Sequence, residues 1–406
     1  MGLDLTSFDA ALKQHYTDDR VENMVYMDNP FLALVPKYEN FGGRNLPIPL
    51  IYGNPQGRSA TFATAQTRGA ATSTKLDDFL LTRVKDYSIA TIDNETLEAS
   101  KGNENAFMEA ATTEIDGAIN SLSRSLAVKL YRDGWGDVGR IGSIASNTIT
   151  LADVEDITNF EVGQQIVVSS SQNAAVLRAG SAIVTNVNRS AGEFTVDNLG
   201  GITGETAGDW IFLAGDRQDS ATPSPLVVSG LGAWVPQTAP TSSAFFAVDR
   251  SVDVTRLGGL RLDASSLPLE EALIEADAQV AREGMALDHF FMSHKRFGEL
   301  KKALGTKVQY VDLQATAKIS FRGILVDGAR GPIKVVPDQN CPNNSVIGVK
   351  LAMWKLYSLG KAVRVIDTDG LQMLRQASAD GVEVRYGFYG NLGCRAPGAN
   401  INIKLA

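Results

Sequence analysis

The clearest periodic pattern of apolar and polar positions lies within residues 94–133. Apolar side chains recur there at spacings of three and four residues, as Ile115, Ile119, Leu122, Leu126 and Leu130. This spacing puts them on one face of an α-helix and predicts a long helix that packs on a core. Asp93 and Asn94 suit its N-cap, and Asp133-Gly134 suits its end.

Gly117 lies inside this helical pattern, where a glycine costs about 1 kcal/mol relative to alanine. Two interpretations stay open. A small residue is accepted where another element packs closely, or the glycine marks a point at which the helix bends.

Two strand-like segments, residues 44–51 (RNLPIPLI) and 78–93 (DFLLTRVKDYSIATID), flank a long polar stretch. That stretch, residues 53–75, has no Asp or Glu. It has one aromatic residue and three cations, which are Phe62, Arg58, Arg68 and Lys75. A loop this long without secondary structure is uncommon inside a compact domain and is usually functional or disordered. We predict an extended hairpin over 44–93 whose tip has nothing of its own to pack on.

The N-terminal residues 1–43 are predicted to form an arm. FDAALKQHY (8–16) is typical of a short helix, and NPFLALVPKY (29–38) is apolar but bracketed by Pro30 and Pro36. No core is evident within the arm, so we expect its apolar residues to be buried against another part of the assembly.

Residues 138–215 consist of short alternating segments separated by Gly, Asn and Ser, which predicts a small all-β unit. Eight carboxylates against Arg140, Arg178 and Arg189 leave a net charge of −5 there, out of −8 for the whole chain. This segment is therefore predicted to be a separate, solvated domain inserted after the long helix.

A connection rich in Pro, Ser and Thr (219–243) leads to the last part of the chain. Residues 265–284 and 294–305 are predicted helices, and 288–293 is a predicted strand between them. The first helix has an apolar stripe of Leu269, Leu273, Ala276 and Val280. A run of strands follows. The predicted class is α+β, with helices on a mixed sheet, an extended hairpin, a long helix and a β insertion.

The amino-acid composition limits the classes of function that this chain can have. With 406 residues, 44% hydrophobic and 21% charged, the chain is long enough for two or three ordinary globular domains. The net charge of −8 argues against broad affinity for phosphate backbones. The apolar runs are too short to span a bilayer, so we expect no membrane association. Cys341 and Cys394 lie far apart and are expected to be free thiols.

No catalytic, cofactor-binding or metal site is predicted. His289 and His294 have no ligand spacing and no third ligand nearby. DTDGLQ (367–372) begins like a calcium loop but lacks the glutamate at its twelfth position, which is Ser378. The chain also has no nucleophile elbow, P-loop or dinucleotide fingerprint. Nothing in the sequence argues for an enzyme.

The order of these parts resembles one family, the major capsid proteins of tailed double-stranded DNA bacteriophages. Two stretches also resemble segments of one branch of that family: FFAVDRSVDVTRLGGLRLDASSLPLEEALIEADAQVAREG (245–284) and VRYGFYGNLGCRAPGANINIKLA (384–406). The resemblance covers nearly the whole chain except 138–215, which is similar to the β insertions of some members.

The resemblance implies the tailed-phage major capsid fold, with peripheral and axial domains. The implied parts are 1–43 as N-terminal arm, 44–93 as extended hairpin loop, 94–135 as spine helix, 138–215 as inserted β domain, 216–264 as peripheral strands, 265–385 as axial domain and 386–406 as a strand returning to the peripheral domain. The hairpin, and the apolar arm of 29–38, are then expected to lie across a neighbouring subunit. Arg58, Phe62, Arg68 and Lys75 would be its intersubunit contacts.

The implied function is a structural shell protein, assembled in the host cytoplasm and resident in the virion. Its expected partners are further copies of itself in hexamers and pentamers, a portal protein, packaged DNA bound without sequence specificity, and in some members a decoration protein. Because the chain starts almost directly at the arm, we expect a separate scaffolding protein or none.

Two other functions stay open. An encapsulin-type compartment shell resembles the same fold, but is shorter and usually lacks such an insertion and arm. A hydrolase or carbohydrate-binding protein with a β accessory domain is the other alternative.

Overall fold

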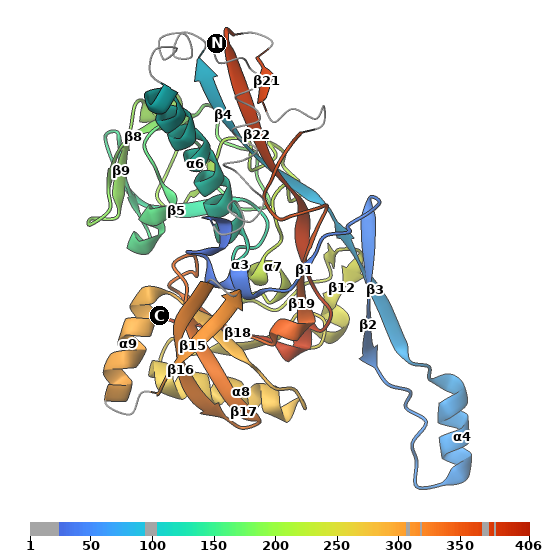
Figure 1. Ribbon diagram of the computed structural model, residues 1–406. Helices are drawn as coiled ribbons and strands as arrows, with labels where there is room; N and C mark the ends of the chain where they lie inside the picture. Colours follow the sequence, from blue (N-terminus) through green and yellow to red (C-terminus); the bar gives the residue numbers. More distant parts are fainter. Residues whose placement is uncertain (1–23, 94–103, 306–308, 317–318, 368–372, 377–378) are drawn as a thin grey trace.

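The chain folds into two mixed β-sheets, a closed β-barrel and a hairpin that extends away from the rest (Figure 1). This computed structural model describes residues 24–93, 104–305, 309–316, 319–367, 373–376 and 379–406. The segment 8–16, the caps proposed at residue 94 and most of the stretch 367–372 lie outside them. The predicted α+β class and the β insertion are confirmed.

The first sheet is organised around two long strands, β4 (Val84–Asp93) and β22 (Gly381–Cys394). They run antiparallel from Val84 opposite Gly390 to Asp93 opposite Gly381. Four shorter strands complete the sheet: β1 (Lys37–Tyr38), β19 (Trp354–Ser358), β20 (Arg364–Val365) and β21 (Met373–Arg375). The helix α6 (Glu104–Lys129) packs against β4 and β22.

The apolar stripe predicted for the long helix is confirmed, because all five of its residues are buried. The helix ends at Lys129 rather than near Asp133. The carbonyls of Leu130 and Tyr131 accept hydrogen bonds from the N–H groups of Leu231 and Gly232 instead of continuing the helix. A Cβ on Gly230 would lie 2.3 Å from the Leu130 oxygen, so this close approach requires glycine.

The second sheet has seven strands in the order β13-β23-β18-β14-β17-β16-β15. Their bounds are β13 (Leu260–Asp263), β14 (His289–Met292), β15 (Gln309–Thr316), β16 (Ile319–Gly328), β17 (Gly331–Pro337), β18 (Ser345–Val349) and β23 (Ile401–Lys404). The helices α8 (Leu269–Arg282) and α9 (His294–Leu304) pack on it, as predicted from their patterns.

The last strands divide between the two sheets. Residues 354–394 supply four strands of the first sheet, although 265–385 was expected to form one unit. The final strand β23 pairs with β13 and β18 of the second sheet. These partners lie far away in the sequence, so local patterns do not indicate them.

The insertion is a closed barrel in the order β10-β5-β6-β9-β8-β7. Its strands are β5 (Asp137–Ala145), β6 (Thr148–Leu151), β7 (Gln165–Ser169), β8 (Ala182–Asn188), β9 (Glu193–Val196) and β10 (Trp210–Leu213). Phe160 and Phe194 stack in its core at 4.5 Å between ring centroids. The barrel has a hydrophobic cluster of its own, separate from those of the two sheets.

One expectation for the connecting segments was wrong. The apolar arm residues Phe31, Leu32 and Val35 are buried in the core of their own chain rather than on a neighbour. The arm forms a short helix there, α3 (Pro30–Leu34). The connection 219–243 contains the helix α7 (Leu231–Trp234), and its Trp234 is fully buried. Both segments hold bulky apolar residues that find a core only through long-range packing.

Candidate functional site

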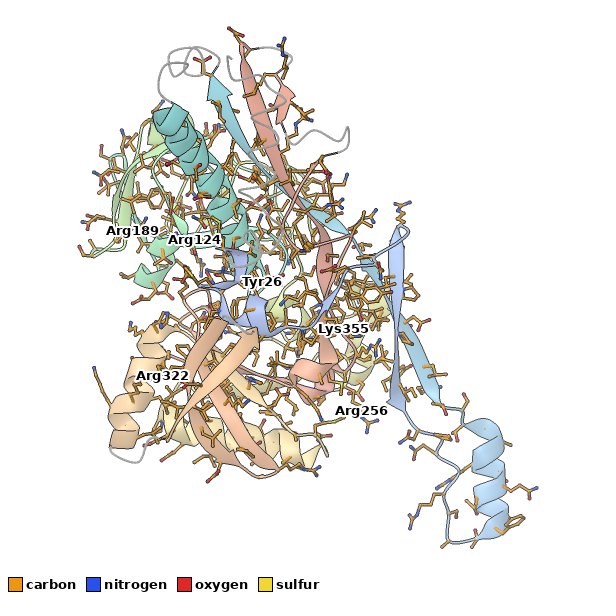
Figure 2. The ribbon with its side chains drawn as sticks, in the orientation of Figure 1. Tyr26, Arg124, Arg189, Arg256, Arg322 and Lys355 are labelled. Atoms are coloured by element: carbon orange, nitrogen blue, oxygen red, sulfur yellow. The ribbon has the colours of Figure 1, made fainter. Side chains whose placement is uncertain are left out.

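The hairpin is anchored to the body by one face of its two strands. β2 (Asn45–Gly53) and β3 (Lys75–Thr82) pair antiparallel, with Ile48 opposite Phe79. Both side chains are buried, and the Phe79 ring lies 4.9 Å from Trp234. The Arg256 side chain, which Figure 2 shows near the end of β2 closest to the tip, donates a hydrogen bond of 2.7 Å to the Tyr52 carbonyl. The two strands of the hairpin are therefore anchored to their own subunit.

The other face of the same strands has no such cover. Its residues, which we call the outer hairpin face, are Pro47, Pro49, Ile51, Leu76, Asp78 and Leu80. Ile51 and Leu76 lie directly opposite each other, and each is 64% exposed. Paired apolar side chains on an open face are a feature of surfaces that bind another protein. This face was not predicted, although the alternation of residues in both strands indicates it.

The hairpin tip is a helix, which corrects the expectation of a tip without structure. α4 (Phe62–Ala71) has the sequence FATAQTRGAA, which is rich in good helix formers. None of its residues is buried. A Cβ on Gly57 would lie 3.0 Å from the Cα of Gly69, so this glycine lets the chain return closely along the helix. The tip is thus ordered but packs on nothing in its own subunit.

The four predicted contact residues are all exposed at this tip. Phe62 and Arg68 are on α4, Arg58 precedes it, and Lys75 begins β3. Phe62 is 83% exposed. None of the three cations forms an ion pair with another residue that the structure describes. The tip therefore presents positive charge and one aromatic ring that its own subunit leaves uncovered.

A second polar region joins α6 to the barrel. Lys129 lies 2.9 Å from Asp86 and 3.1 Å from Asp216. Burial disfavours the Lys129 ammonium, but Asp216 and Asp86 together outweigh this and raise the pKa of Lys129. Arg132 contacts Asp156 at 2.5 Å. The barrel is therefore attached by buried charge pairs as well as by the chain itself.

The same junction contains a cleft of about 280 Å³ that Gly117 helps to line. Gly117 lies within continuous α6 and is exposed, and no other side chain lies where its Cβ would be. On the far side, Glu161 contacts Arg124 of α6 at 2.9 Å and Arg189 of the barrel at 3.9 Å; Figure 2 labels both arginines. Burial and the neighbouring Asp137 raise the pKa of Asp133 to about 7.

A buried polar cluster, which we call the arm anchor, holds the arm in its own subunit. Asp338 accepts hydrogen bonds from the Phe31 N–H at 3.1 Å and from the Tyr131 hydroxyl at 2.8 Å. Asn340 donates to Asp338 and to Asn29. Arm, long helix and second sheet meet here, and no sequence motif indicated it.

Within the part of the chain that the structure describes, no group of three or more His, Cys, Asp or Glu side chains could hold a metal ion. Among the same residues, no helix combines the length and apolar character needed to cross a bilayer.

No protein-family model and no curated protein matches the sequence. Similar solved structures include the capsid asymmetric unit of cyanophage A-1(L), which is 11% identical, with 93% of this chain and 92% of that chain covered and a TM-score of 0.49. The virus-like particle from Pyrococcus furiosus is 9% identical, with 95% and 96% covered and a TM-score of 0.40. The procapsid of satellite phage P4 is 10% identical, with 96% and 99% covered and a TM-score of 0.39. These matches extend along nearly the whole length of the chain and of the structures compared with it.

Proposed function

We propose that the chain is a non-enzymatic building block of a closed icosahedral shell, assembled from hexamers and pentamers around a double-stranded DNA phage genome. The observation that carries the proposal is the hairpin. A two-stranded ribbon is marginally stable by itself, and this one ends in a helix without a single buried residue. A neighbouring subunit would cover both the outer hairpin face and the tip.

The tip is the proposed intersubunit clamp. Arg58, Arg68 and Lys75 carry charges with no carboxylate partner among the described residues, in a chain of net charge −8. Their proposed partners are carboxylates on an adjacent copy, and Phe62 is the proposed anchor in an apolar pocket there. One exposed ion pair contributes only about 0–1 kcal/mol. Repeated at every contact of a shell, such increments add up.

The barrel is proposed to project from the outer surface of the shell. It has its own hydrophobic core and an excess of acidic residues, both of which suit a solvated domain. An isolated fragment of residues 138–215 should unfold cooperatively. An unfolded fragment, or density that places the barrel on the inner wall of a shell, would contradict this part of the proposal.

The other proposed partners are a portal protein, a separate scaffolding protein, a decoration protein and the packaged DNA. The acidic chain suits an inner wall that does not adhere to DNA. A protein compartment of the encapsulin type is the second candidate, because the same hairpin could clamp subunits of a shell without a genome.

Electron microscopy of the purified full-length protein, expressed with and without its neighbouring genes, tests the proposal. We expect closed shells, and shells from infected cells should contain nuclease-protected DNA. Closed shells that never contain DNA would favour the compartment. A chain that stays monomeric at high concentration under all these conditions would refute both.

A further inference from the structure

A hollow of about 310 Å³ lies between α8 and the hairpin formed by β16 and β17. Most of its wall is apolar, and includes the buried side chains of Leu273, Phe290 and Ile333. Ile274, which is 63% exposed, also lines it. Such a hollow would be unremarkable in an apolar surface, but this one also contains a carboxylate.

Asp277 is only 5% exposed and lines the hollow. Its Oδ2 accepts a hydrogen bond of 2.5 Å from the N–H of Ala329, which fixes the turn between β16 and β17. Its Oδ1 is buried and has no hydrogen-bond partner among the described residues. Buried polar atoms are nearly always paired, because leaving one unpaired is costly. The turn explains one oxygen, and the other has no donor among the described residues.

The chemistry of the hollow selects the donor. Apolar walls accept an aliphatic stem, and the negative charge of the Asp277 carboxylate attracts a cationic nitrogen at its end. Asp327 also lines the hollow and disfavours an anion. A guanidinium prefers two acceptor oxygens in one plane, whereas a lysine ammonium is a compact charge that needs only one. A lysine side chain therefore fits better than an arginine.

The distribution of charge on the two helices of the second sheet points to the source of this lysine. α8 carries Glu270, Glu271 and Glu275 in addition to Asp277. α9 carries three exposed lysines, and two of them, Lys295 and Lys302, form no ion pair with another described residue. Each copy of the chain thus has an acidic hollow and a basic helix. The acidic hollow of one copy can therefore contact the basic helix of the next copy. Head-to-tail contacts of this kind close into a ring when the rotation between adjacent copies brings the last copy back to the first.

We propose that the Asp277 hollow binds a lysine side chain from α9 of a second copy, and that this contact joins adjacent subunits around each ring of the shell. The inference deepens the proposed function and rests on it. The hairpin clamp and this contact use different parts of the subunit, so each can fail alone.

Assembly of the full-length chain followed by light scattering tests the contact. Asp277→Asn keeps an acceptor for the Ala329 N–H and removes the charge from the hollow. It should raise the protein concentration needed for assembly about tenfold. One of Lys295→Gln and Lys302→Gln should do the same, and combining it with Asp277→Asn should add little. Glu155→Gln, which neutralises an exposed acid of the barrel, is the control and should change the concentration less than about twofold.

The unassembled full-length chain supplies the second measurement, with n-butylammonium as the probe and n-butanol as its control. The wild type should bind the ammonium and not the alcohol, and Asp277→Asn should bind neither. The contact would be overturned if Asp277→Asn assembled at the same protein concentration as the wild type. It would also be overturned if the double variant showed the full sum of the effects of the acid variant and the lysine variant on that concentration. Binding of the probe together with unchanged assembly would assign the hollow to free amines instead. If the wild type never assembles, the shell proposal fails. If, in addition, the wild type does not bind n-butylammonium, the claim that the hollow binds an ammonium group is refuted separately.

Discussion

Replacing Asp338 by alanine would remove the centre of the arm anchor. The carboxylate is 1% exposed, and its two oxygens accept hydrogen bonds from the arm, from Tyr131 just beyond the end of α6, and from its own loop. Alanine leaves the Phe31 N–H and the Tyr131 hydroxyl without an acceptor in a site closed to solvent. Arm and long helix then lose their polar link to the second sheet.

The magnitude follows from these contacts. Each buried donor left unpaired costs about 1–3 kcal/mol. Part of this cost is offset, because the substitution also removes a buried carboxylate. Burial disfavours the charged form of Asp338 and so raises its pKa. We expect Asp338→Ala to lower the free energy of unfolding by about 3–5 kcal/mol. Tyr131→Phe removes one donor and leaves Asp338 with its other partners, so it should cost only about 1 kcal/mol.

Urea unfolding of the unassembled chain, followed by tryptophan fluorescence, measures these values. Limited proteolysis adds a local reading, since residues 24–35 should become cleavable in Asp338→Ala before the rest of the chain unfolds. The exposed Asp78 of β3, replaced by alanine, is the control and should change stability by less than about 0.5 kcal/mol. An Asp338→Ala chain as stable as this control, with a protected arm, would refute the anchor.

Three further predictions concern the junction and the tip. A carboxyl whose pKa is raised on folding holds its proton more tightly in the folded state, so Asp133 should lower the free energy of unfolding as the pH rises from 3.8 to about 7. Asp133→Asn should abolish that fall and stabilise the chain above pH 7 by about 1–3 kcal/mol in thermal melts; an unchanged pH profile would contradict this. Gly117→Ala meets no neighbour at its Cβ and should stabilise α6 by up to about 1 kcal/mol, and it should slow maturation of precursor shells if α6 bends there; normal precursor yield and maturation would exclude the bend. Phe62→Ala and Arg68→Glu should leave the subunit fold unchanged and lower the temperature at which shells disassemble; variant shells as heat-stable as the parent would show that the tip is no clamp.

The sequence predicted those elements that depend on local patterns. The stripe of α6 and the alternating segments of the barrel are local, so their helix and strands could be recognised from spacing alone. The unbalanced charges of Arg58, Arg68 and Lys75 were also visible in the sequence, whereas the role of these residues and of Phe62 as intersubunit contacts stays a prediction.

What could not be predicted depends on contacts between distant residues, or on a helix without an apolar face. α4 has no buried residue, so it lacks the stripe by which helices are recognised. The arm was misplaced because Phe31 packs between Tyr131 and Phe291, which are distant in the sequence. The pairing of β23 with β13, rather than with β22, is likewise a matter of tertiary packing.

Amide hydrogen exchange of the hairpin tip tests the central claim most directly, if it is compared between unassembled subunits and purified shells. A single exposed helix of this length is marginal in water, so the amides of α4 should exchange almost freely in the unassembled subunit. In the shell, an adjacent subunit should cover Phe62 and slow their exchange by about 100-fold or more. The buried strand residues Ile48 and Phe79 should be protected in both states and serve as the internal control. Equal exchange of α4 in subunit and shell would contradict the claim that the hairpin clamps a neighbour.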